Sequence, residues 1–185
     1  MTGIKSGARA LGIAESYSGK ESTLAGVVVR ANRVVDGIIF DSCTVGGIDA
    51  TDTICSLVDR LDREDIQYIL VAGIVPAWFN IVDLHRLHED TGIPVLSVTF
   101  EKSDGLAPAI TDAFDDPSDR LEIYQSQPDR HPVTLDADTL YVRQVGLDEE
   151  TAATVVRAFT PEGGRPEPVR VARLAARGAD EFRRT

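Results

Sequence analysis

The chain has few lysines and cysteines, and it has no long apolar run. Lys5, Lys20 and Lys102 are its only lysines, and Cys43 and Cys55 are its only cysteines among 185 residues. Two cysteines make neither a disulfide framework nor a metal cluster, so we expect both to be small apolar fillers with reduced thiols. No apolar stretch reaches the roughly 18–20 residues of a membrane span, which predicts a protein without a membrane partner.

The N-terminal segment 1–10 also lacks the apolar centre of a signal peptide, so we expect a cytoplasmic protein. The length predicts one domain over residues 1–185. The formal net charge is −11. This acidic, lysine-poor composition is typical of a halophilic protein in a cytoplasm with very high salt, where the Debye length falls to ~3 Å at 1 M salt. We therefore expect greater stability in molar salt than in dilute buffer. The acidity still permits a local arginine patch that binds nucleic acid.

The spacing of apolar residues predicts strands first and alternating helices and strands afterwards. The predicted strands cover 8–14, 24–30, 33–40, 66–72, 93–100 and 139–145. The predicted helices cover 49–63, 80–91, 105–114, 148–159 and 169–182. Residues 115–138 are polar, which predicts an irregular excursion. The second and third strands are joined so briefly that they must form an antiparallel hairpin. This order predicts an α/β three-layer sandwich with a mixed five- or six-stranded sheet, and it resembles the ribonuclease H-like fold.

The C-terminal third carries the most informative motif. The strand Leu140–Gly146 is followed by a helix-like run and then by Arg-Pro-Glu-Pro-Val-Arg-Val-Ala at 165–172. This order resembles the C-terminal third of endonuclease V, a family that cuts DNA or RNA near deaminated bases with a metal held by carboxylates. The whole chain is more similar still to the DUF99 (UPF0215) proteins, an endonuclease V-like archaeal family. That similarity rests on GIAES at 12–16, TVGGIDATD at 44–52, NIVDL at 80–84, GIPVLSVTFE at 92–101 and PEPVRVARL at 166–174.

The resemblance places the four metal-binding positions of endonuclease V at residues without a carboxylate. These positions are Ala14, Thr53, Ala72 and Arg173. The resemblance also places Thr44-Val-Gly-Gly47 where that family has a Tyr-Ile-Pro-Gly wedge, which helps to expose the damaged base. It therefore implies the family's scaffold without its metal mechanism, and we expect neither a cofactor nor a dedicated metal site. His85 and His88 can share a helix face, but the pattern gives them no further ligand.

Four acidic residues are candidates for a shifted catalytic set: Glu15, Asp49, Asp52 and Glu101. Glu15 and Glu101 end predicted strands, and strand ends can converge in this fold. Two-metal chemistry needs grouped oxygen ligands that hold the ions ~3.5–4 Å apart, and Mg²⁺ prefers carboxylates and water. The alternative is structural. Alternation along the strand places Glu15 on the face opposite Ala14, and Asp49 and Asp52 both suit the start of a helix.

Five residues are candidates for contacting nucleic acid: Gly46, Gly47, Trp78, Arg170 and Arg173. The two glycines could bring backbone N–H groups close to a phosphate, or they could simply meet the geometry of a loop. Trp78 follows a buried strand and could stack on a base or pack against a helix. The arginines share a cationic strip with Arg165 and Arg177. This strip could contact the phosphate backbone or form salt bridges with acidic helices.

Three classes of function remain open. The first is a protein associated with DNA or RNA that lacks the metal–carboxylate set of endonuclease V. The second is a divergent nuclease dependent on Mg²⁺ or Mn²⁺, which would use Glu15, Asp52 and either Asp49 or Glu101. The third is a small-ligand or protein-interaction module that reuses the fold. The observation that separates them is whether three of the four acids approach one point in an open cleft.

Overall fold

The computed structural model describes residues 3–185, so Met1 and Thr2 of the segment searched for a signal peptide lie outside the described residues. The strands are β1 (Arg9–Tyr17), β2 (Glu21–Arg30), β3 (Val35–Thr44), β4 (Ile66–Val71), β5 (Val95–Thr99), β6 (His131–Thr134) and β7 (Thr139–Val145). The helices are α1 (Ala50–Leu61), α2 (Pro76–Phe79), α3 (Leu84–Thr91), α4 (Ala107–Ala113), α5 (Ser118–Ser126), α6 (Glu149–Ala158) and α7 (Glu167–Arg184). None of the described helices is long and apolar enough to span a membrane.

The strands form one mixed sheet in the order β3-β2-β1-β4-β5-β7-β6. β1, β2 and β3 are antiparallel neighbours, whereas β4 runs parallel to both β1 and β5. This topology confirms the predicted hairpin meander and the mixed sheet. The sheet has seven strands, not five or six, because the segment 115–138 holds α5 and β6 where we predicted an irregular excursion. β6 is only four residues long and buries only Val133, so it shows no alternating pattern.

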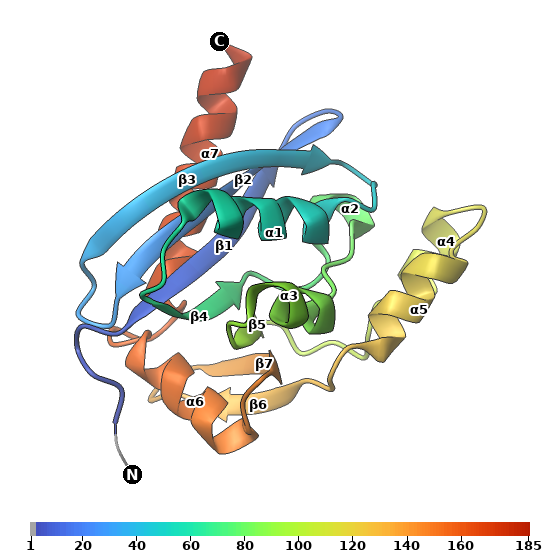
Figure 1. Ribbon diagram of the computed structural model, residues 1–185. Helices are drawn as coiled ribbons and strands as arrows, with labels where there is room; N and C mark the ends of the chain where they lie inside the picture. Colours follow the sequence, from blue (N-terminus) through green and yellow to red (C-terminus); the bar gives the residue numbers. More distant parts are fainter. Residues whose placement is uncertain (1–2) are drawn as a thin grey trace.

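Helices cover both faces of the sheet, which confirms the three-layer sandwich (Figure 1). On one face, Leu11 and Ile13 of β1 pack with Ile54 and Leu57 of α1. On the other face, Ala14 packs with Val27, Val29 and Ala172 of α7. Helix α6 covers β5 and β7 on that second face through Val155, Val156 and Phe159. Alternate residues of β1 therefore enter different layers, as the period of a strand requires.

One helix boundary near Asn80 differs from the prediction. We predicted a helix over 80–91, but α3 begins at Leu84, where Asp83 accepts hydrogen bonds from the backbone N–H groups of His85 and Arg86. The Asn80 side chain is fully buried and bonds the Thr44 carbonyl at 2.8 Å and the Ala50 N–H at 2.9 Å. Asn80 therefore ties the loop before α1 to the segment before α3 and takes no part in the helix.

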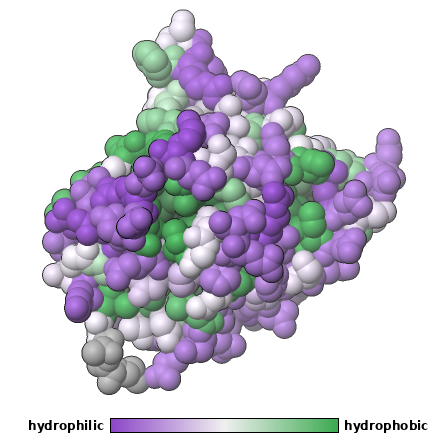
Figure 2. Space-filling model, viewed as in Figure 1, coloured by the Kyte–Doolittle hydropathy of each residue, from purple (hydrophilic) through white to green (hydrophobic). Residues whose placement is uncertain are grey.

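The two outer strands of the sheet have protected edges. On β3, the Phe40 carbonyl accepts a hydrogen bond from Arg60, and the Asp36 carbonyl accepts one from Arg63. At the opposite edge, β6 is short and contains Pro132, which has no N–H to donate. Hydrophilic side chains cover much of the face shown in Figure 2, and the hydrophobic residues there form separate patches.

Candidate functional site

A cleft lies at the carboxyl ends of the parallel strands β1, β4 and β5. It consists of two adjoining cavities that share Ala72, Gly73 and Arg173 in their walls. The larger has a volume of about 370 Å³, which is enough for a small ligand or one nucleotide. The smaller, about 110 Å³, reaches Glu15 and Ile54. Open α/β sheets bind ligands outside the carboxyl ends of their strands, so this is the expected position for a site.

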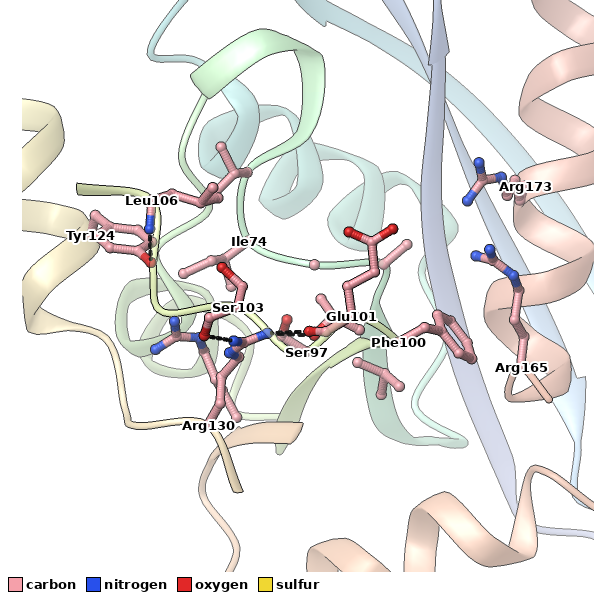
Figure 3. A pocket seen from close by; sticks show the side chains of 16 residues that line it. Ile74, Ser97, Phe100, Glu101, Ser103, Leu106, Tyr124, Arg130, Arg165 and Arg173 are labelled. Atoms are coloured by element: carbon pink, nitrogen blue, oxygen red, sulfur yellow. Dashed lines mark hydrogen bonds between the residues drawn. The ribbon is translucent and has the colours of Figure 1, made fainter. Parts of the chain in front are cut away.

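Helix α7 forms one wall of the cleft because its first turn lies directly against β1. A Cβ atom at Gly12 would come within 2.0 Å of the Pro168 carbonyl oxygen, so only glycine permits this approach. The contact places the start of α7 across the sheet. Arg165, just before the helix, and Arg173, two turns along it, then reach the cleft from the same side (Figure 3).

Arg165 and Arg173 are two cations that share one wall without a carboxylate partner. No ion pair of either residue occurs within residues 3–185. The Arg165 guanidinium lies 4.4 Å from the centre of the Phe100 ring. Burial lowers the pKa of Arg165 from its usual value, and the positive charge of Arg173 lowers it further. Both effects oppose the charge, so a bound anion would relieve them.

Two further arginines hold the opposite side of the cleft in place. Arg130 donates from Nη1 to the Glu101 carbonyl at 3.0 Å and from Nη2 to the Ser103 carbonyl at 2.6 Å. Arg143 donates to the Pro128 carbonyl, and burial lowers its pKa. Neither forms an ion pair with a carboxylate in the described part of the chain. Glu101 is the one acid among the residues lining the larger cavity, and Figure 3 shows its carboxylate between the two sides.

The four acidic candidates do not converge on one point. Glu15 lines the smaller cavity and accepts a 2.6 Å hydrogen bond from Ser22, whereas Glu101 lines the larger one. Asp52 is exposed on α1 and pairs with Arg86 of α3. Across residues 3–185, no three His, Cys, Asp or Glu side chains are grouped closely enough to hold a metal ion.

Asp49 has a structural task in the loop before α1. Its carboxylate accepts hydrogen bonds from the Thr44 N–H at 3.0 Å and from Asn80 Nδ2 at 2.7 Å. Partial burial acts to raise its pKa, but these hydrogen bonds outweigh burial, and the pKa lies below its ordinary value. Asp49 suits the start of a helix, and it occupies the cap position of α1 but makes no side-chain capping bond there.

The positions that the resemblance assigned to metal ligands gather in the cleft, with one exception. Ala14, Ala72 and Arg173 all line the smaller cavity. Thr53 does not line it, and its hydroxyl donates to the Asp49 carbonyl at 2.7 Å. As predicted, Glu15 and Ala14 belong to opposite faces of β1, with Ala14 packed toward α7.

The glycine and tryptophan candidates lie together beside the cleft. Gly46 donates its N–H to the Ala77 carbonyl at 2.7 Å, and a Cβ atom at Gly46 would come within 2.8 Å of the Trp78 ring. Gly46 also has a φ of +68°, so glycine is required here for two reasons. Arg120 of α5 donates to the carbonyl oxygens of Gly46 and Gly47. Because these carbonyls bind a cation, the loop with the two glycines contacts α5 and does not have the arrangement of a phosphate-binding loop.

The proposed cationic strip on α7 is divided. Arg170 pairs with Glu167 on its own helix and lies outside the cleft, so only Arg173 of the two named arginines lines it. Arg165 also lines the cleft. The sequence placed it in the strip but did not make it a separate candidate. The signal that could have found it is Phe100, an aromatic residue at the end of a buried strand, on which a guanidinium can lie.

The histidines and cysteines have local roles. His85 Nε2 lies 3.1 Å from the Ser126 carbonyl, and His88 Nδ1 lies 2.8 Å from the Ile93 carbonyl. Cys43 is buried, and this burial raises its pKa to about 12, as expected for an apolar filler. Cys55 is half-buried, and burial together with Asp90 raises its pKa to about 11.

Comparisons with known proteins identify a family and a fold. A family model described as Endonuclease dU matches residues 6–179. A UPF0215 protein of Thermococcus kodakarensis is 40% identical over 167 residues, covering 87% of this chain and 85% of that protein. A protein of unknown function from Archaeoglobus fulgidus has a crystal structure that matches with a TM-score of 0.84, 31% identity and coverage of 92% and 97%. Endonuclease V of Ciona intestinalis, solved in complex with a 24mer DNA containing inosine, matches with a TM-score of 0.61, 14% identity and coverage of 94% and 86%.

Proposed function

Because the chain belongs to the endonuclease dU (UPF0215) family, we propose that its cleft binds the sugar–phosphate backbone of a nucleic acid. The family agrees with the resemblance expected from the motifs, and the fold is that of endonuclease V. The observation that carries the proposal is the pair Arg165 and Arg173, which face one cavity without a carboxylate partner within residues 3–185. Guanidinium groups bind phosphate oxygens through paired N–H donors, so a phosphodiester is a suitable counter-ion.

The two sides of the cleft have different roles in this proposal. Arg165 rests on the Phe100 ring, which fixes the plane of its guanidinium and leaves its N–H groups for a ligand. Arg173 approaches from α7 at the boundary of the two cavities and can hold the same phosphate or its neighbour. On the other side, Arg130 donates to the carbonyls of Glu101 and Ser103 and so fixes the position of the loop after β5. Binding of this kind needs backbone contacts and shape, and it needs no carboxylates.

The residues of the cleft do not fit the metal centre that the fold family implies. Magnesium in two-metal nucleases is held by several grouped carboxylates, whereas this site has methyl groups at Ala14 and Ala72 and a fixed cation at Arg173. A guanidinium would repel the ion at the same position. We therefore propose that Arg173 supplies the positive charge that a metal supplies elsewhere in this fold.

Deoxyuridine-containing DNA is the first ligand to test. The family description reads Endonuclease dU, where dU is the usual symbol of deoxyuridine, and the Ciona endonuclease V was crystallised with inosine-containing DNA. Both uracil and hypoxanthine are deaminated bases. Our proposal is that this chain binds DNA or RNA near such a base.

A second candidate function is a divergent nuclease dependent on Mg²⁺ or Mn²⁺. It is favoured by the positions of Glu15 and Glu101, which line adjoining cavities. Mg²⁺ can be held by one or two carboxylates together with substrate phosphates. Asp49 and Asp52 are not part of this proposed catalytic set, because their carboxylates already bond Asn80 and Arg86. The third class, a small-ligand or protein-interaction module, would leave the arginines without a nucleic-acid ligand.

The test measures binding and cleavage with the same oligonucleotides. Fluorescence anisotropy with labelled DNA, with and without deoxyuridine, should show binding that weakens as potassium chloride rises. Replacing Arg173 by glutamine should weaken binding by about 10- to 150-fold, since a charge-assisted hydrogen bond contributes about 1.5–3 kcal/mol. Arg170→Gln is the matched control on the same helix and should leave binding unchanged, because Arg170 lies outside the cleft. Equal losses in both variants, or no binding by the wild type, would overturn the proposal.

The same samples decide between the first two functions. Incubation with Mn²⁺ followed by gel analysis should give no cleaved product if the cleft only binds. Product that disappears in Glu15→Gln or Glu101→Gln, while binding is retained, would favour the divergent nuclease.

A further inference from the structure

We infer that Trp78 is a stacking platform for an unpaired base, and that the cleft therefore takes a single-stranded or locally unpaired nucleic acid. This inference rests on the proposed function of the cleft. It adds a contact beyond the phosphates and a class of substrate.

The Trp78 side chain is apolar, yet 47% of the residue is exposed. The backbone around it is unusual, because Ala77, Trp78 and Phe79 have φ values of 48°, 53° and 64°. Residues with a Cβ rarely adopt this left-handed conformation, and three in succession are rarer still. Ala77 points inward and is buried, so the same turn that buries its neighbour presents Trp78 at the surface. Backbone conformations of this kind tend to occur at binding sites.

The Trp78 ring is held rigidly from behind. Its centroid lies 5.6 Å from that of Phe79 and 5.2 Å from that of Phe114, and both pairs are inclined rather than stacked. On another side, the Trp78 ring contacts Gly46, where even a methyl group would clash. Arg120 completes the support, since its guanidinium lies 3.8 Å from the Phe114 ring centre. A ring fixed in this way loses little entropy when a planar base stacks on its exposed face.

The platform follows the lining of the arginine cleft along the chain. Residues 73–75 line the larger cavity, and Pro76 lines the smaller one. Trp78 follows two residues later, at the same edge of the sheet. The arm formed by α4 and α5 projects beside α3 in Figure 1. It supplies Phe114 and Arg120 to the platform and Leu106 and Tyr124 to the cavity wall. A strand whose phosphates lie against Arg165 and Arg173 can therefore extend along this segment.

The combination of a cationic groove and an exposed aromatic ring is the chemistry that binds unpaired strands. Each base presents a π-face to an aromatic ring only when it is not stacked within a duplex. An intact duplex could contact the arginines through its phosphates, but it would offer no face to Trp78. The structure therefore favours an unpaired strand over an intact duplex.

Trp78 is the single tryptophan of the chain, so tryptophan fluorescence reports on the surroundings of this one ring. The probes are oligothymidylate of about ten nucleotides, within the span of one typical single-strand site, an abasic strand of equal length, and a duplex of equal length. Oligothymidylate should quench the Trp78 emission. The abasic strand, which has the same phosphates without bases, should bind to the arginines without quenching. Equal quenching by both strands would mean that the arm moves and no base stacks, and it would overturn the inference. Quenching by the duplex equal to that by oligothymidylate would also overturn it.

Two substitutions of similar apolar character separate stacking from packing. Trp78→Leu should weaken binding of oligothymidylate by about 5- to 150-fold, the range for the loss of one base–aromatic stack. Trp78→Phe keeps an aromatic ring and should retain most of the affinity. Circular dichroism and thermal unfolding verify that both variants fold. If Leu and Phe weaken binding equally, Trp78 acts only by packing and the inference is wrong. Binding that depends on Arg173 but not on Trp78 would leave the proposed function intact, whereas failure of every strand to bind the wild type would reject both.

Discussion

Two sets of arginines in this molecule differ in what their guanidinium groups contact. Near the outer part of the sheet, Arg9, Arg30 and Arg63 all converge on the Asp36 carboxylate. In the cleft, Arg165 and Arg173 face one cavity and no carboxylate pairs with either within residues 3–185. The first set fixes the pKa of Asp36 well below its usual range, mainly through its hydrogen bond from Arg9. In the second set, burial and mutual repulsion disfavour the charge of Arg165.

Arginines therefore have two separate uses in this acidic protein. With a net charge of −11, the chain has more carboxylates than cationic side chains, so an arginine can readily have an acidic partner. The Asp36 cluster shows that the chain makes such pairs between β1, β2, β3 and the end of α1. The absence of pairing in the cleft is therefore a property of that site, and it is consistent with an external anion.

Reversal of one cleft charge should have the largest effect on binding. Arg173→Glu should weaken nucleic-acid binding by about 100-fold at low salt, because it removes a charge-assisted contact and adds repulsion. The fold should remain as stable as before, since the new carboxylate lies near Arg165. Anisotropy and thermal unfolding measure the two effects. A large drop in melting temperature would show that Arg173 supports the fold in the same way as the Asp36 cluster.

Asp36→Asn should have the opposite profile. It leaves three arginines without their shared carboxylate, so the melting temperature should fall, and the fall should shrink as salt screens the charges. Nucleic-acid binding should not change, because Asp36 is not part of the cleft. Weakened binding in a variant that is still folded would mean that the two arginine sets are coupled.

Acid titration should give a smaller effect, on stability alone, through the Asp36 carboxylate. The folded pKa of Asp36 lies below the unfolded value of about 3.9, so the carboxylate stabilises the fold above that pH. This contribution is lost as the pH falls through the folded pKa. Below about pH 4, the wild type should therefore lose stability more steeply than Asp36→Asn in low-salt urea unfolding. Identical slopes would show that the Asp36 cluster contributes little.

Much of the fold follows from local patterns in the sequence. The predicted strand over 139–145 coincides with β7, and the helix predicted over 148–159 coincides with α6 to within a residue at each end. These segments have clear apolar periodicity and a capping acid, Asp148, which accepts a hydrogen bond from the Thr151 N–H. β6 and α5 were missed because one has a single buried residue and the other has none. Pairing with β7 forms β6, and that pairing is not a local property.

The candidate site was only partly predictable, because its contacts join distant segments. The approach of Pro168 to Gly12 brings α7 onto β1 across more than 150 residues of sequence, and it determines which arginines reach the cleft. Arg170 and Arg173 look equivalent in the sequence, but only the structure separates them. The choice between a shifted catalytic set and structural roles for the four acids depended on distant segments too, since Asn80 and Arg86 occupy the carboxylates of Asp49 and Asp52. Whether the site residues act in binding or cleavage stays a prediction.

The guarded edge of β3 has a consequence for how the protein behaves in a crowded solution. An open outer strand of ten residues with exposed Val35, Ile38 and Phe40 is a template on which further chains could add, as in amyloid growth. Arg60 and Arg63 occupy two of its carbonyl oxygens and place positive charge along the rim. A newly arriving strand would have to displace both side chains before it could pair. We therefore expect these two arginines to hinder the addition of a further strand at β3.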